Sequence, residues 1–399
     1  MRVLILTYGS EGDTRPLAAL GHALVQAGHQ AHLLADAATL GSARALGLPC
    51  TALAGDIHAA MSAEGSMRRI EANLSRLTIA HSAQWLQQAL ALGAGCDLLL
   101  VSGLAAFVGL SAAEALGVPA VGAMLIPISP TARFASPFLP FTPPRLFNRA
   151  SHLLFGHASW RLFRAATNRA RAQAGLPPRQ RPWTDQPMLY GISPSLLPSP
   201  PDWPGNAHLT GQWLAPAPPG WSPPPALLQF LEAGEPPVYV GFGSMGGFDT
   251  ARVREAVVHA VGGRRAVFHR GWSGIDPASL PPNFHPIDPL PHQWLLPRCA
   301  AAIHHGGSGT THTVARAGVP AAVLPFAGDQ FFWAARLRRL GIMRHRLAAR
   351  SVRPGALAAA LDHALRAEVR ARAAALGERM RAEDGLGAAV ALLRRYAGA

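Results

Sequence analysis

The segment His304–Thr311 combines the residue types that bind an anionic phosphate group. It reads HHGGSGTT, follows an apolar run and opens a helical pattern. Its three glycines let an anion approach the backbone, and a helix N-terminus supplies unpaired N–H groups. The groups predicted to contact phosphate are those of His305, Gly307, Ser308, Gly309 and Thr310. The alternative is a glycine turn that only packs a helix against a strand.

Two further polar segments follow apolar runs in the same half of the chain. Gly241–Gly247 reads GFGSMGG and places Ser244 in a second glycine-rich turn, so the two turns together suit a diphosphate. Asp329 and Gln330 follow the apolar run 321–324 and combine a carboxylate with a carboxamide, which suits the vicinal hydroxyls of a sugar. The alternative for Asp329 is a plain helix N-cap.

A dinucleotide site is a competing interpretation of the same residues. Asp329 lies 20 positions after Gly309, roughly where an acid would hold a ribose hydroxyl. The full GxGxxG pattern is absent, however, and the preceding apolar run is not the first of its half. A nicotinamide enzyme is therefore disfavoured.

Alternating apolar runs and amphipathic segments predict the elements that position these loops. Strands are expected at 3–7, 31–35, 97–102, 120–125, 238–242, 266–269, 301–304 and 321–324, with helices at 16–28, 105–116, 250–261, 310–317 and 330–340. This alternation predicts an α/β fold of two Rossmann-like, doubly wound parallel sheets that face each other across a cleft. Breaks at Ser102–Gly103 and Gly117–Pro119 argue against a membrane span in the apolar stretch 98–126.

A proline-rich segment divides the chain into two predicted domains. Six of the twelve residues in 214–225 are proline, which excludes a continuing helix or central strand. We therefore expect an N-terminal domain over 1–213, a linker over 214–226 and a C-terminal domain over 227–385.

Composition excludes several classes of protein. The chain has 399 residues and a formal charge of +14, and all 36 of its basic side chains are arginine. Without lysine there is no Walker-type loop, no kinase β3 lysine and no pyridoxal Schiff base. Three dispersed cysteines predict neither disulfides nor a zinc site. The arginines accompany no nucleic-acid-binding motif, so we expect no nucleic-acid partner, and the short apolar start predicts a cytoplasmic protein.

The residues of the C-terminal half resemble a known signature. The stretch 304–342, HHGGSGTTHTVARAGVPAAVLPFAGDQFFWAARLRRLGI, is similar to the donor-binding signature of nucleotide-sugar glycosyltransferases with the GT-B fold. GSEGDTRP at 9–16, with GFGSMGG and HRGW, resembles the bacterial antibiotic and sterol branch of family GT1. This resemblance implies that His305, the 308–310 amides and Ser244 hold the diphosphate of a UDP- or dTDP-sugar. It further implies that Asp329 and Gln330 hold the sugar, that Trp272 or the segment 290–294 flanks the base, and that the helix 386–397 braces the first domain.

The resemblance also implies that the domain 1–213 binds the acceptor and the domain 227–385 binds the donor, and it implies the chemistry. Asp13 falls where the family places its general base. The acceptor hydroxyl would displace the diphosphate with inversion, through a transition state with oxocarbenium character. Asp13 would act alone, because the strand that ends Val101–Gly103 offers no partner acid. Its alternative role is a helix cap. No DxD motif occurs, so we expect no metal and no cofactor beyond the donor.

The acceptor is expected to be a hydrophobic alcohol, such as a sterol, another lipid or an antibiotic. The irregular segment 129–144 is rich in proline and phenylalanine and predicts acceptor contacts at Phe134, Phe138 and Phe141. Arg145–Arg181 interleaves arginine with apolar residues, as in helices that lie on an anionic membrane. The competing functions are a nucleotide-sugar epimerase and a catalytically inactive sugar-nucleotide-binding partner protein. The intact Asp–Gln pair favours glucose as the sugar.

Overall fold

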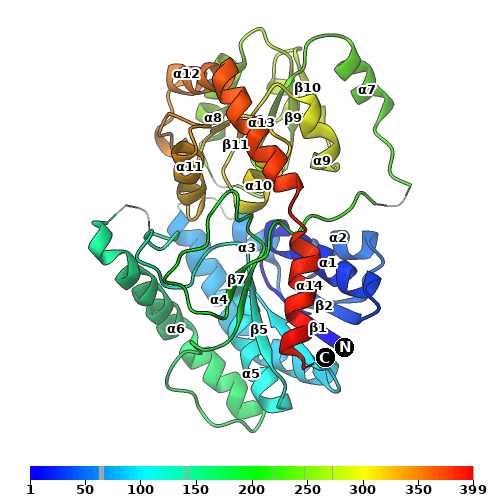
Figure 1. Ribbon diagram of the computed structural model, residues 1–399, viewed down its shortest axis with the longest axis vertical. Helices are drawn as coiled ribbons and strands as arrows, with labels where there is room; N and C mark the ends of the chain where they lie inside the picture. The colour runs from blue at the N-terminus through cyan, green and yellow to red at the C-terminus, as the bar shows by residue number, and fades with distance from the viewer. Residues whose placement is uncertain are drawn as a thin grey trace.

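The computed structural model describes residues 1–62, 67–139, 141, 143–218, 220–246, 248–271 and 273–398. It contains two parallel-sheet α/β domains, which confirms the fold class predicted from the sequence. Figure 1 shows the N-terminal half, blue to green, below the C-terminal half, yellow to orange. The two sheets have the strand orders β3-β2-β1-β4-β5-β6-β7 and β10-β9-β8-β11-β12.

The first sheet is covered on both faces. Its strands are β1 (Arg2–Leu6), β2 (Gln30–Asp36), β3 (Cys50–Leu53), β4 (Leu98–Val101), β5 (Ala120–Met124), β6 (Met188–Tyr190) and β7 (Ala207–Leu209). Successive side chains of a strand point to opposite faces. Accordingly Val3 and Ile5 join one apolar core, whereas Leu4 and Leu6 join another. The apolar runs of the sequence are therefore strands buried on both sides, as a parallel sheet requires.

The helices of the first domain are α1 (Glu11–Gln26), α2 (Gly41–Ala45), α3 (Ile57–Ser62), α4 (Met67–Gly93), α5 (Ala106–Leu116) and α6 (Asn148–Gln173). Helix α1 begins five residues earlier than the sequence pattern predicts, because Ser10 and Asp13 form a capping box before Pro16. Short 3-10 turns lie at η1 (Ala37–Thr39), η2 (Gly103–Ala105) and η3 (Arg145–Phe147). Within 129–144 the described residues belong to neither helix nor strand, as expected.

The second domain repeats the pattern around a shorter sheet. Its strands are β8 (Val238–Gly241), β9 (Ala266–His269), β10 (Phe284–Ile287), β11 (Ala301–His304) and β12 (Ala321–Val323). Its helices are α7 (Pro225–Glu232), α8 (Thr250–Val261), α9 (His292–Leu295), α10 (Ser308–Arg316), α11 (Gln330–Arg339), α12 (Pro354–Ala364) and α13 (Ala367–Arg381), with 3-10 turns η4 (Pro277–Ser279), η5 (Leu296–Arg298) and η6 (Ala349–Ser351). Helix α7 begins inside the expected linker and shortens the extended segment by two residues.

The chain returns to the first domain at its end. Helix α14 (Gly385–Tyr396) places Ala389 and Leu393 in the apolar core formed with β1 and α1, and Tyr396 OH lies 2.8 Å from His208 Nε2. Figure 1 shows the red helices α13 and α14 on different domains. Between them, Glu383 accepts hydrogen bonds from Ser193 Oγ and the Ser195 amide.

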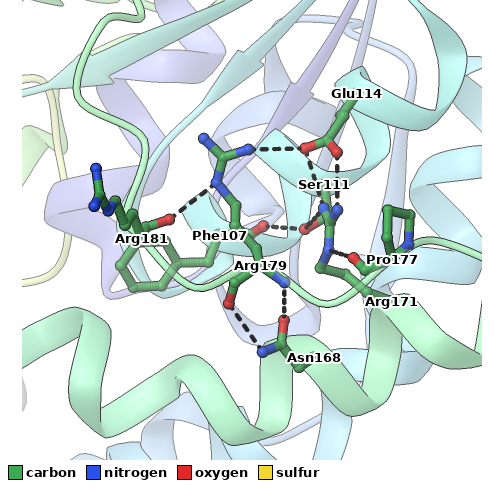
Figure 2. Close-up of polar contacts among 8 residues, drawn as sticks. All are labelled: Phe107, Ser111, Glu114, Asn168, Arg171, Pro177, Arg179 and Arg181. Carbon is green, nitrogen blue, oxygen red and sulfur yellow. Dashed lines mark hydrogen bonds and ion pairs between the residues drawn. The ribbon is translucent and has the colours of Figure 1, made fainter.

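A buried arginine fastens the C-terminal end of α6 to α5. Arg171 is 1% exposed and donates to both oxygens of Glu114, and Arg179 donates to the same carboxylate from the opposite side. Figure 2 shows both guanidinium groups turned toward Glu114. These two arginines therefore do not belong to the membrane-facing surface that the sequence predicts over Arg145–Arg181.

Candidate active site

The predicted phosphate loops lie at the position where the second sheet reverses its strand order. Strands β8 and β11 are neighbours, and the loops that follow them are 242–247 and 305–307. Crevices at such switch points, beyond the carboxyl ends of the strands, are where open α/β sheets bind ligands. Helix α10 begins after Gly307, which supplies no capping side chain, so the first-turn amides are available to an anion.

The ring of His305 lies between the two glycine loops. A Cβ atom at Gly243 would lie 2.9 Å from His305 Cε1, and one at Gly307 would collide with His305 Nε2. Gly243 also has a φ of +59°, which favours glycine. The sequence therefore needs glycine at both positions to admit the imidazole beside the helix N-terminus.

Burial keeps His305 neutral. Burial lowers the pKa of the ring to about 4, although a hydrogen bond with the Gly241 backbone acts to raise that pKa. The Nδ1 atom is buried without a hydrogen-bond partner among the described residues. A buried polar atom without a partner is uncommon in proteins and marks a place where a ligand can supply the bond. Ser244, Gly309 and Thr310 are partly exposed around the same space.

Asp329 occupies the N-cap position of α11 but does not cap the helix through its side chain. Its Oδ2 accepts a 2.9 Å hydrogen bond from Trp333 Nε1 instead. Burial raises the pKa of Asp329 to about 7; the bond from Trp333 opposes this shift, and the charge of Asp13 adds to it. Asp329 therefore stands at the N-cap position, but the prediction that its side chain caps the helix is wrong.

Gln330 holds the loop before α11. Its Oε1 accepts from the amides of Phe326 and Ala327, at 2.7 and 3.2 Å, and its Nε2 lies 3.0 Å from Met245 Sδ. The predicted sugar-binding carboxamide thus connects the loop after β12 to the loop after β8. Sequence reasoning gave no role to Met245, because 85 residues separate it from Gln330.

Asp13 reaches the same region from the first domain. It is the third residue of α1, and its Oδ2 accepts from the Ser10 amide at 2.8 Å and from Ser10 Oγ at 3.1 Å. In the described part of the chain no hydrogen bond uses its Oδ1. Burial raises the pKa of Asp13, and the two bonds from Ser10 oppose that shift. The side chain therefore serves the capping box with one oxygen and leaves the other free.

The loops of the two domains meet directly. Ser308 Oγ donates a 2.7 Å hydrogen bond to the Leu125 carbonyl just after β5, and Gln212 Nε2 donates to Thr313 Oγ1 at 2.9 Å. The Ser308 hydroxyl is thus occupied in this arrangement, which leaves its amide for the expected phosphate contact. Across the domain boundary, the charge of Asp13 contributes to the raised pKa of Asp329.

Comparisons with known proteins agree with this geometry. Residues 267–386 match the family model described as Erythromycin biosynthesis protein CIII-like, C-terminal domain. The chain is 34% identical to the O-mycaminosyltylonolide 6-deoxyallosyltransferase of Streptomyces fradiae over 100% of this chain and 98% of that protein. This chain belongs to glycosyltransferase family GT1, in its antibiotic and sterol branch.

Other relatives and solved structures extend the likeness of this GT1 glycosyltransferase. A sterol 3-beta-glucosyltransferase of Candida albicans is 33% identical over 85% of this chain, which spans 24% of that protein's length. The glycosyltransferase of kitacinnamycin has a TM-score of 0.74 at 20% identity, covering 99% of this chain and 98% of its own. VinC, solved in complex with DTDP, has a TM-score of 0.66 at 22% identity over the whole of both chains.

The expected acceptor phenylalanines of the GT1 glycosyltransferase do not form one cluster. Phe134 is buried, with its ring centroid 5.1 Å from that of Phe332 on α11. Phe138 stacks on Phe155 of α6 at 4.4 Å, and Phe141 is 65% exposed. They mark successive positions between the domain interface and the outer surface of α6.

The residues predicted to flank the nucleotide base lie only partly within the described chain. Trp272 lies outside the described residues. In the alternative segment 290–294, Trp294 packs its ring edge-on against Trp221 at 5.5 Å, and Gln293 donates to the Ala215 carbonyl. This segment therefore contacts the linker as well as the donor domain.

Arg15 is a residue that the sequence interpretation left without a role. It lies on α1 two positions after Asp13, and its charge lowers the pKa of His269 and His292 in the donor domain. Both imidazoles have depressed pKa values, about 4 and about 3, chiefly because they are buried. Arg15 also forms an exposed ion pair with Glu11 at 3.5 Å, and the GDTRP motif contains it, so the motif could have suggested this position.

The described residues offer neither a metal site nor a membrane-spanning helix. No cluster of three or more His, Cys, Asp or Glu side chains suited to a metal ion occurs among the described residues. No helix in the described ranges is long and apolar enough to cross a membrane.

Proposed function

We propose that this glycosyltransferase moves a hexose from a UDP- or dTDP-sugar to a hydroxyl group of a hydrophobic acceptor, with inversion at the anomeric carbon. One observation carries the proposal. Two carboxyl groups with raised pKa values, Asp13 and Asp329, approach from opposite domains beside an uncapped helix N-terminus and the unpartnered His305 Nδ1. This arrangement brings together a base, a carboxylate that can accept hydrogen bonds from sugar hydroxyls, and an anion site.

The donor diphosphate would lie at the start of α10. The free amides and the helix dipole favour its negative charge, and His305 donates a hydrogen bond in its neutral form. As the bond between the anomeric carbon and the phosphate oxygen breaks, the charge that grows on the leaving group is stabilised by donors already in place. No metal or cofactor is required in this scheme.

Asp13 would accept the proton of the acceptor hydroxyl. The oxygen of that hydroxyl forms the new bond to the anomeric carbon while its proton passes to the free Oδ1. A raised pKa makes the carboxylate a better base near neutral pH than an ordinary aspartate. Ser102, where a partner acid would lie, donates to Met124 Sδ at 3.8 Å, so Asp13 acts alone.

Asp329 would hold hydroxyl groups of the donor sugar. Partial burial leaves the ionised form of Asp329 less solvated than in water, and hydroxyl donors from the sugar would compensate for that loss. Glucose is the proposed sugar, supported by the Asp–Gln pair and by the name of the Candida albicans relative. The proposed nucleotide is uridine or thymidine diphosphate, the latter supported by the DTDP bound to VinC.

The acceptor class follows from the relatives and from the aromatic segment. Curated relatives are named for a tylonolide derivative and for sterols. Phe134 and Phe138 line the side of the first domain that adjoins α6 and α11, which suits an apolar alcohol. A cytoplasmic enzyme with peripheral contact to an anionic membrane is the proposed setting.

The experiment is a mass-spectrometric screen of UDP- and dTDP-hexoses against sterols, hydroxylated lipids and macrolide aglycones. Transfer with inversion to one acceptor class supports the proposal. Conversion of the donor without any acceptor would favour the epimerase. Donor binding without turnover on any acceptor would favour an inactive sugar-nucleotide-binding protein.

A further inference from the structure

The outer face of η3 and α6 carries most of the exposed apolar side chains of the described chain. The described chain has eight exposed large hydrophobic residues, and six of them lie between 141 and 162. They are Phe141, Leu146, Phe147, Leu153, Leu154 and Leu162. Leu146 and Leu154 are 77% and 68% exposed. A concentration of this kind marks an interaction surface, whereas scattered exposed residues do not.

Three of these residues lie along one line of the helix surface. Phe147 at the end of η3, Leu154 and Leu162 follow at intervals of seven and eight, which is two turns each. The opposite side of α6 holds the buried His152 and Ala170. The exposed apolar side chains of η3 and α6 therefore lie on the outer half of this segment, and we call this surface the α6 face. Figure 1 shows α6 at the edge of the N-terminal domain.

The chain segment that carries the α6 face is rich in arginine and contains no acidic residue, although Asp202 from outside the segment lies near Arg149. No aspartate or glutamate occurs between Glu114 and Asp185, and nine arginines lie in that interval. Two of them, Arg171 and Arg179, turn inward to Glu114, as Figure 2 shows. The other seven are exposed, and none of them takes part in an ion pair of the described chain. They are Arg133, Arg145, Arg149, Arg161, Arg164, Arg169 and Arg181.

The segment before η3 places aromatic rings against both α6 and the donor domain. Phe138 stacks on Phe155 of α6, and Phe134 lies against Phe332 of α11. Phe332 lies three residues after Asp329, the proposed sugar-binding residue. The apolar segment that adjoins the α6 face therefore also contacts the helix that begins after the proposed sugar-binding residue.

We infer that the α6 face docks on an anionic lipid bilayer and takes the hydrophobic acceptor from it. Leucine and phenylalanine side chains enter the boundary between headgroups and acyl chains, while the arginines bind lipid phosphates. Charge complementarity decides the occupant, because segment 133–181 exposes seven arginines that form no ion pair among the described residues, and such an excess of cations matches phosphate headgroups. This inference rests on the proposed function, since it names the source of the acceptor for the same site.

The test measures binding to vesicles of phosphatidylcholine, with or without about 30% phosphatidylglycerol. The full-length protein should sediment with the anionic vesicles and not with the neutral ones. Binding should weaken when salt rises from about 0.05 to about 0.5 M, because screening shortens the reach of the arginines.

Charge variants identify the surface. Arg161→Gln with Arg164→Gln should weaken binding to anionic vesicles by about tenfold or more. The matched control, Arg344→Gln with Arg346→Gln, removes the same charge from exposed positions of the other domain and should change little. Equal losses in both double variants would overturn the inference in favour of a general charge effect.

Apolar variants test insertion. Leu146→Gln with Leu154→Gln should reduce vesicle binding while leaving transfer to a detergent-dispersed acceptor unchanged. The control is Val25→Gln with Ile79→Gln, at positions 40% and 37% exposed on other helices. If the α6 variant instead dissolves a dimer seen in gel filtration, the face binds a second copy and the inference is wrong.

The outcome separates this inference from the proposed function. Transfer to the dispersed acceptor without any vesicle binding overturns the membrane surface alone. Vesicle binding that depends on the α6 face, with no transfer to any acceptor, overturns the function and leaves the surface standing. Faster transfer to an acceptor embedded in anionic vesicles, lost in both α6 variants, supports the two together.

Discussion

Replacing Asp329 by asparagine should stabilise the protein, by an amount that grows with pH. Burial raises the pKa of this carboxyl from 3.8 to about 7, so the folded state favours the protonated form. The contribution of that form to stability is fully present below pH 3.8 and is lost as the pH rises through about 7. Above that point the fold holds an ionised carboxylate that is better solvated in the unfolded chain.

The structure gives the size of the effect. The interval from 3.8 to about 7 corresponds to about 4 kcal/mol at about 1.4 kcal/mol per pH unit. Because the side chain is partly exposed, solvent screening reduces this to about 2 kcal/mol. Asparagine keeps an oxygen that accepts from Trp333 Nε1, so the local contact survives. The variant should match the natural protein near pH 4 and exceed it by about 2 kcal/mol at pH 8.5.

The assay is denaturant unfolding of both proteins at several pH values, analysed as the difference between them. The buried histidines titrate equally in both proteins and cancel in that difference. Asp185→Asn is the control, because Asp185 is exposed and should give no pH-dependent difference. A constant difference between pH 4 and 8.5, or a less stable variant at high pH, would refute the reasoning about burial.

Three further predictions concern single side chains. His305→Ala should weaken UDP binding in calorimetry and slow transfer by about 10²-fold, the loss typical of one oxyanion donor; activity that collapses in EDTA would contradict this assignment. Arg15→Gln should weaken UDP binding a few-fold and flatten its salt dependence; an unchanged affinity at low salt would remove Arg15 from the site. Arg171→Leu should lower the free energy of unfolding by about 2–3 kcal/mol, because Glu114 loses its buried partner; denaturant unfolding at an unchanged midpoint would show that the pair is not structural.

The strands that carry the proposed site were predictable from the sequence because they are buried on both faces. Strands β1, β8 and β11 appear as continuous apolar runs, and each is followed by glycines that end the strand. Strands at or next to a sheet edge gave weaker signals. β10 contains Pro286, which is tolerated at a sheet edge but obscures the strand pattern, and β6 and β7 are three residues long.

The positions of the individual side chains depended on contacts between distant residues. No local pattern shows that Ser308 bonds to the Leu125 carbonyl 183 residues away, or that Gln330 reaches Met245. The phenylalanines of segment 129–144 share a composition but separate in space, because Phe134 packs at the domain interface and Phe141 faces outward. Composition predicted an apolar segment and could not assign its members.

The most direct test of the proposed mechanism is the kcat/KM of Asp13→Asn for the acceptor that the screen identifies. Asparagine keeps an oxygen for the Ser10 amide, so α1 and UDP binding should survive while the proton acceptor is removed. Transfer should fall by about 10²- to 10⁴-fold, the range for loss of a general base. In the natural protein, kcat/KM should fall as the pH drops through the raised pKa of Asp13. A variant with near-natural kcat/KM and an unchanged pH profile would contradict the assignment of Asp13 as the base.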